Sequence, residues 1–64
     1  MNKELVRLHD GVNKVFITKE NDTWKFFLCE TYGEAKSLKI ALTEIGNYCE
    51  IDENSYGWFV RVKK

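Results

Sequence analysis

Apolar and polar positions alternate along this chain in short blocks typical of strands, interrupted by one block of helical period. Near the N-terminus, the β-favouring runs LVRLH and VNKVFIT flank Asp10-Gly11, a dipeptide that strongly favours a tight hairpin turn. The run KENDT then separates VFIT from TWKFFLCE and predicts a second hairpin, because it is rich in turn-forming residues. A short N-terminal helix capped by Asn2 is the competing interpretation of the first segment.

A helix is predicted over residues 32–46. Thr31 and Glu34 stand three positions apart, so that each can bond the backbone of the other in a capping box. With about 100° of rotation per residue, the apolar side chains of this segment gather on one side. They are Ala35, Leu38, Ala41, Leu42 and Ile45. Gly46 suits the left-handed position that ends many helices.

The C-terminal part of the chain predicts one more hairpin. YCEID is a short alternating run, ENSYG is typical of a turn, and WFVRVKK is typical of a strand. The order is therefore β-β-β-α-β-β. We expect an α+β fold in one small domain, residues 1–64, with a mainly antiparallel sheet of four to five strands and the helix packed on one face.

Parity assigns each strand residue to a face of the sheet, because side chains alternate along a strand. The most apolar set is expected to meet the helix: Val15, Ile17, Trp24, Phe26, Leu28, Trp58, Val60 and Val62. The opposite face then carries Lys14, Phe16, Thr18, Lys25, Phe27, Cys29, Phe59, Arg61 and Lys63. This second set combines phenylalanines with basic residues.

A face of that kind is a candidate binding surface. Open sheets with aromatic and basic side chains stack bases and neutralise phosphates in several single-strand-binding modules. The residues that would do so here are Lys14, Phe16, Lys25, Phe27, Phe59, Arg61 and Lys63. The alternative is a structural role, in which the face is covered by Leu5, Val6 and Leu8 of the terminal segment, or by a second subunit that makes a homodimer.

Two further surfaces are candidates for contact with a protein. Ile40 lies opposite the apolar stripe of the predicted helix and can serve as an apolar anchor ringed by charge. Acidic residues gather in or beside the predicted turns and strand ends and can meet a basic groove on a partner. They are Glu20, Asp22, Glu30, Glu50, Asp52 and Glu53.

Composition limits the function classes. The 64 residues are 44% hydrophobic and 14% aromatic, which is enough for a packed core. Ten Lys and Arg balance ten Asp and Glu, so the chain lacks the overall basic field that drives non-specific nucleic-acid binding. No apolar run approaches the roughly 20 residues of a membrane span, and the N-terminus has no secretory pattern. We therefore expect a cytoplasmic protein with no membrane partner.

Catalytic and cofactor signatures are not found in the sequence. Cys29 and Cys49 form no C-x-x-C pair and are expected to be reduced thiols. His9, the one histidine, has no nucleophile near it in the sequence and is expected to be an exposed turn residue. Glycine-rich phosphate loops and metal-binding motifs are also missing. We expect neither an enzyme nor a bound metal or cofactor.

In size and element order the chain resembles small phage-encoded inhibitors. The stretch from WKFFLCE to GWFVRV is also similar in rhythm to half of a SPOR domain, the peptidoglycan-binding module of division proteins. No functional residue is carried over from either group.

The sequence thus leads to one main hypothesis. We expect a small cytoplasmic protein-binding module, of the phage inhibitor or adaptor type, that acts by occluding a surface of its partner. Single-stranded nucleic-acid binding through the aromatic and basic sheet face is the alternative.

Overall fold

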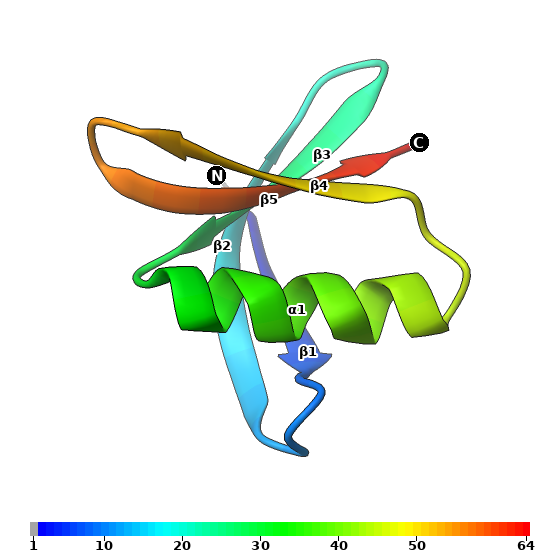
Figure 1. Ribbon diagram of the computed structural model, residues 1–64. Helices are drawn as coiled ribbons and strands as arrows, with labels where there is room; N and C mark the ends of the chain where they lie inside the picture. The colour runs from blue at the N-terminus through cyan, green and yellow to red at the C-terminus, as the bar shows by residue number, and fades with distance from the viewer. Residues whose placement is uncertain (1) are drawn as a thin grey trace.

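Five antiparallel strands form one sheet, and one helix lies on one of its faces (Figure 1). The computed structural model describes residues 2–64. Its elements are β1 (Asn2–Arg7), β2 (Asn13–Glu20), β3 (Trp24–Cys29), α1 (Tyr32–Glu44), β4 (Cys49–Asn54) and β5 (Gly57–Lys63). The strands lie side by side in the order β1-β2-β3-β5-β4, so β1 and β4 are the two edges. The predicted fold class and element order are confirmed, with five strands.

The first hairpin has a wider loop than the sequence predicts. Asp10-Gly11 lies at its tip, where Gly11 has a φ of 88°, but the strands end at Arg7 and resume at Asn13. Leu8 leaves the strand and turns into the core, and its amide donates to the carbonyl of Val12 at 2.8 Å. Burial of Leu8 thus accounts for the longer loop, and the competing N-terminal helix is wrong.

The helix begins as the sequence predicts and ends two residues earlier. The Thr31 hydroxyl accepts from the Glu34 amide at 3.1 Å, and the Glu34 carboxylate accepts from the Glu30 amide at 3.3 Å. Glu34 therefore reaches one residue further back than in a standard capping box. Helix α1 ends at Glu44, and Ile45 lies outside the apolar stripe with 75% of its surface exposed.

The core lies between α1 and the sheet. Ala35, Leu38 and Leu42 of α1 are buried against alternate residues of the strands. Phe16 and Phe27 are the largest of these, exposed by only 1% and 2%, and their rings meet edge to face at 6.2 Å. The other buried strand residues are Thr18, Cys29, Cys49, Val60 and Val62.

The predicted face assignment is right for β5 and wrong for β2 and β3. Val60 and Val62 are buried and Trp58 packs against the core, as expected. On β2, by contrast, the helix-facing residues are Phe16 and Thr18, and Val15 and Ile17 point away. On β3 they are Phe27 and Cys29. The error arises because both faces of these two strands are apolar, so counting apolar residues chose the wrong parity.

We predict that two adjacent substitutions on β2 have very different effects. Phe16→Ala should lower the free energy of unfolding by about 3–5 kcal/mol, because it leaves a cavity at the centre of the core. Ile17→Ala should cost less than about 1 kcal/mol, because this side chain already faces solvent. Urea unfolding followed by tryptophan fluorescence measures both values. A larger loss for Ile17→Ala than for Phe16→Ala would show that β2 faces the other way.

Candidate functional site

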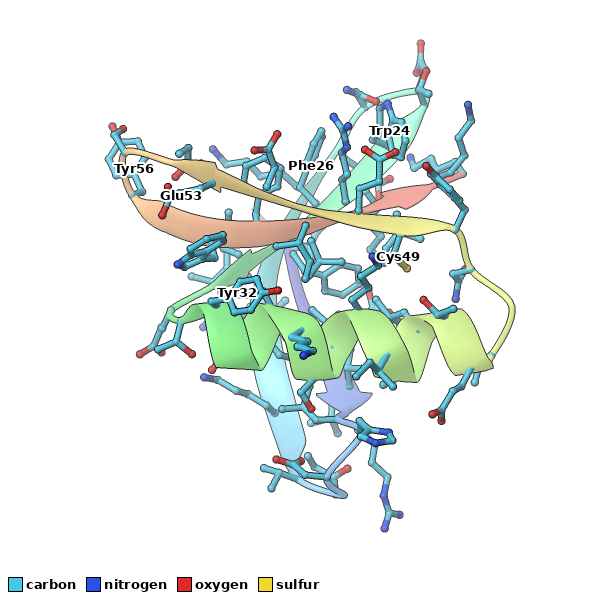
Figure 2. The ribbon with its side chains drawn as sticks, in the orientation of Figure 1. Trp24, Phe26, Tyr32, Cys49, Glu53 and Tyr56 are labelled. Atoms are coloured by element: carbon cyan, nitrogen blue, oxygen red, sulfur yellow. The ribbon has the colours of Figure 1, made fainter. Side chains whose placement is uncertain are left out.

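The side of the sheet away from α1 has no covering layer in residues 2–64, and we call it the open face. Figure 2 shows Trp24 and Phe26 projecting from this side, opposite α1. The strand registers place the following residues on it: Lys3, Leu5, Arg7, Val15, Ile17, Lys19, Trp24, Phe26, Leu28, Glu50, Asp52, Phe59, Arg61 and Lys63.

Exposed aliphatic side chains form the centre of the open face. Leu5, Val15, Ile17 and Leu28 are exposed by 66%, 54%, 40% and 36%. Leu5 lies directly opposite Val15 in the β1–β2 register, so these side chains are close neighbours. Single exposed apolar residues are ordinary, but a contiguous group on one face marks an interaction site.

Two aromatic groups continue this surface onto β5. Phe26 and Phe59 are half-buried and meet edge to face, with ring centroids 5.8 Å apart. Trp24 is covered by two cations, because the Arg61 guanidinium lies 4.8 Å and the Lys63 ammonium 5.4 Å from its ring centroid. The Trp24 ring is therefore already engaged within the chain.

Charge is distributed unevenly over the open face. Arg61 is held by Glu50, whose carboxylate accepts from the Arg61 Nε at 2.9 Å. Hydrogen bonds from Tyr48 and Arg61 lower the pKa of Glu50, and the bond to Glu50 raises the pKa of Arg61. Among the described residues, four other cations of the face have no ion-pair partner. These cations are Lys3, Arg7, Lys19 and Lys63. On the same face, Asp52 is the one carboxylate within residues 2–64 that has no ion-pair partner.

The sequence-predicted binding residues are divided between the two sides of the sheet. Phe59, Arg61 and Lys63 lie on the open face. Placing Phe16 and Phe27 there is wrong, because both rings are in the core. Lys14 and Lys25 have the same parity as these rings and lie at the helix side, within 5.8 and 5.4 Å of the Phe16 and Phe27 centroids respectively. These seven residues therefore form no single surface.

The remaining predicted surfaces are also placed by the structure. Ile40 is half-buried and lies at an apolar depression between α1 and β4. Three of the acidic residues are engaged in ion pairs: Glu20 with Lys64, Glu30 with Lys14 and Glu50 with Arg61. His9 is exposed and lies 3.3 Å from Glu44.

Sequence reasoning missed the aliphatic part of the open face. The sequence assigns Val15, Ile17 and Leu28 to the helix side, and it leaves Leu5 either in a strand of the first hairpin or in a terminal segment that covers the sheet. Instead, β1 is an edge strand in the plane of the sheet, with Leu5 on its open side and Val6 on its helix side. A two-residue turn at Asp10-Gly11 would pair Leu5 with Phe16, so the sequence carries no direct signal for the Leu5–Val15 pairing, which results from the wider loop.

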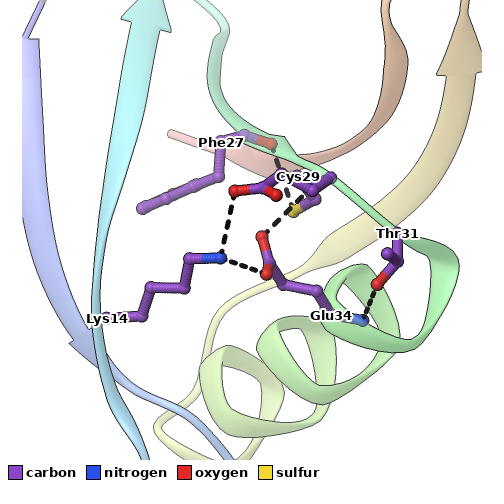
Figure 3. A network of polar contacts seen from close by, with 6 residues as sticks. Lys14, Phe27, Cys29, Thr31 and Glu34 are labelled. Carbon is purple, nitrogen blue, oxygen red and sulfur yellow. Dashed lines mark hydrogen bonds and ion pairs between the residues drawn. The ribbon is translucent and has the colours of Figure 1, made fainter.

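Lys14 takes part in a polar network at the helix side of the sheet (Figure 3). It forms an ion pair with Glu34 at the start of α1 and lies 3.5 Å from Glu30. The bond to Glu34 raises the pKa of Lys14. This contact is possible because β2 and β3 pair over three residues only and then diverge, which leaves room for the lysine.

The two cysteines are buried free thiols. Burial, with the nearby charge of Glu34, raises the pKa of the Cys29 thiol to about 12. Burial also raises the pKa of Cys49, although Thr43 and Lys39 act in the opposite direction. Neither thiol is activated as a nucleophile, because activation requires a lowered pKa.

Comparison of the chain with protein families, with characterised proteins and with solved structures finds no match. Within residues 2–64, no group of three or more histidine, cysteine or acidic side chains is placed to hold a metal ion. The same residues include no helix with the length and apolar character needed to cross a membrane.

We predict that Cys29 makes the protein less stable at alkaline pH. An unfolded thiol loses its proton near pH ~8.5, whereas the folded Cys29 keeps it, so the free energy of unfolding falls as pH rises above this value. The slope for this one group approaches ~1.4 kcal/mol per pH unit. Cys29→Ala should therefore lose stability less steeply than the wild type between pH ~8 and ~10. Urea unfolding at a series of pH values measures both slopes, and parallel profiles would contradict the assignment.

Proposed function

We propose that this protein binds another protein through the open face of its sheet and acts by covering a surface of that partner. The observation that carries the proposal is the group of exposed aliphatic side chains on β1, β2 and β3, headed by Leu5 and Val15 at 66% and 54% exposure. Burying apolar surface is the main source of free energy in protein association. A sheet whose strands are already paired presents such a surface without a large cost in ordering.

The chemistry of the face favours a protein over a nucleic acid. Bases stack on aromatic rings, and aliphatic side chains such as Val15 and Ile17 offer no stacking platform. Phe26 and Phe59 pack against each other, and Trp24 is covered by Arg61 and Lys63. An apolar centre of leucine, isoleucine and valine, in contrast, complements the apolar centre of a protein interface.

The charges around this centre indicate the kind of partner. Lys3, Arg7, Lys19 and Lys63 lie on the same face and have no ion-pair partner in residues 2–64. A partner with an apolar patch bordered by carboxylates would neutralise them, and such complementarity sets specificity and the rate of association. If a second copy of the chain bound through the same face, cations of the two copies would lie opposite one another over most of the contact. Their repulsion favours a different protein as the partner.

Occlusion without catalysis is consistent with the small size of the chain. With extents of 28 × 25 × 19 Å, its sheet face is comparable to the roughly 800 Å² that each partner contributes to a standard interface. An inhibitor or adaptor in the cytoplasm, of the kind that phages encode, is the role that fits such a module.

We predict that a charge placed in the aliphatic centre abolishes partner binding. The wild type and Ile17→Glu would be immobilised, proteins from a lysate of the native cells captured, and the enriched protein purified and titrated by calorimetry. Ile17→Glu should weaken binding at least about thirtyfold, because it buries a carboxylate among apolar groups and beside the acidic rim of the partner. Ile45→Glu is the matched control, since Ile45 is 75% exposed outside the open face, and it should bind as the wild type does.

Several results would contradict the proposal. Equal binding by Ile17→Glu and the wild type would show that the partner uses another surface. Tight binding of a labelled oligonucleotide at low salt, with a steep salt dependence and with quenching of Trp24, would favour the nucleic-acid alternative. A dimer in sedimentation that Ile17→Glu makes monomeric would identify a second copy as the occupant.

A further inference from the structure

A second surface lies at the other side of the molecule, where α1 runs beside β4. Tyr32, Ile40 and Ile51 line an apolar depression between the helix and this strand. Tyr32 closes one end by packing edge to face on Trp58, with centroids 5.0 Å apart. Trp58 is the register partner of Glu53, whereas Thr43 acts on the Cys49 thiol at the other end of the strand, so the helix runs antiparallel to β4 along the depression. Figure 1 shows α1 and β4 running beside each other.

The backbone of β4 next to this depression is an unpaired sheet edge. The Lys63 amide donates to the Tyr48 carbonyl at 3.0 Å, which sets the alternation of the β4–β5 ladder. Glu50 and Asp52 therefore bond β5, and the amides and carbonyls of Ile51 and Glu53 point outward. In agreement, the Glu53 amide is bonded to the side chain of Asp52 at 2.8 Å and not to β5.

We propose that this edge and depression form a binding site for an extended peptide segment of a partner protein, which adds to the sheet beside β4. A residue opposite Ile51 would direct its side chain toward Ile40, because paired residues project to the same face. Main-chain bonds to the amide of Ile51 and to the carbonyls of Ile51 and Glu53 would supply affinity, and the depression would select an apolar side chain at this position. The site lies apart from the open face and goes beyond the function proposed above.

Charges on both sides of the strand specify the rest of the peptide. Lys36 and Lys39 border the depression on α1 and have no ion-pair partner in residues 2–64. They call for an acidic residue two positions from the apolar one, at the place opposite Cys49, whereas an acidic residue opposite Glu53 would be repelled by that carboxylate. On the other side of β4, Asp52 has no ion-pair partner in residues 2–64 and calls for basic residues at the positions between. From the place opposite Glu53 to the place opposite Cys49, the recognised segment is thus neutral, basic, apolar, basic, acidic.

A second copy of β4 is a poor occupant of the same edge. This strand carries Glu50, Asp52 and Glu53 and no basic residue. Pairing it with itself would place acidic side chains opposite or diagonal to one another, which destabilises a sheet. The charge of β4 therefore favours a peptide of complementary sequence over self-association.

The test uses two capped peptides of equal length. One has the central sequence threonine, lysine, leucine, lysine, glutamate, which places the threonine opposite Glu53 when the peptide adds antiparallel to β4. The other has each lysine replaced by glutamate and the glutamate replaced by lysine, and both peptides are flanked by threonine. Titration of the ¹⁵N-labelled protein should shift the amides of Ile51 and Glu53, and hydrogen exchange at Ile51 should slow when the first peptide is bound. The exchanged peptide should bind at least about tenfold more weakly, because each favourable cross-strand charge pair becomes a repulsive one.

Charge reversal on the helix gives a result that a loss of folding cannot imitate. The double variant Lys36→Glu/Lys39→Glu should reduce or invert the preference between the two peptides. Lys64→Glu, which reverses a charge at the C-terminus away from this depression, should keep the wild-type preference. Equal affinity for the two peptides, or no binding of either at millimolar concentration, would overturn the proposal. Amide shifts confined to residues of the open face would also overturn it. So would hydrogen-exchange protection of β4 that increases with protein concentration in the absence of peptide.

Discussion

The one described helix can cover only one face of the five-stranded sheet, and this constraint determines how the rest of the molecule is arranged. Helix α1 has 13 residues and is the only helix in the described part of the chain. It can bury one face of the sheet, and its own apolar side presents only Ala35, Leu38 and Leu42 as buried residues. The strands therefore supply most of the core from one face. Their other face remains in solvent although it is also apolar, which is why it is the candidate for binding.

The elements of this fold could be predicted from local patterns, whereas the choice of face could not. Each element depends on residues that are close together in the sequence: turn residues, the capping residue Thr31, and apolar and polar residues that alternate along the strands. These local patterns predict the right order of elements. The side of a strand that meets the helix depends instead on packing between distant residues. Phe16 and Phe27 are buried because their rings fit each other and the helix. Their neighbours Ile17 and Phe26 are as apolar and offered no local sign that they would face solvent.

Lysines at the ends of β2 and β3 added to this error. Lys14 and Lys25 share the parity of Phe16 and Phe27, so they make this face of β2 and β3 less apolar than the other in the sequence. In the fold, each is matched by a carboxylate from another element, Glu34 for Lys14 and Glu4 for Lys25. Their stems lie along the core while the ammonium groups reach these carboxylates at its rim. A basic residue near a strand end is therefore compatible with the buried face when a carboxylate of the helix or of another strand lies within reach of its ammonium group.

Although the net charge of the chain is zero, its positive and negative charges are unevenly distributed over the surface. Ion pairs with Glu34 and Glu4 engage Lys14 and Lys25 on the helix side, whereas four cations of the open face have no ion-pair partner in residues 2–64. The charged residues of β4 are all acidic, and Lys36 and Lys39 of α1 lie across the depression from this strand. The open face and β4 therefore each carry charge of mainly one sign beside apolar groups, an arrangement that opposes self-association through like-charge repulsion. The same repulsion disappears when a partner brings the opposite sign. Charge thus protects these apolar surfaces in the free protein and selects what can cover them.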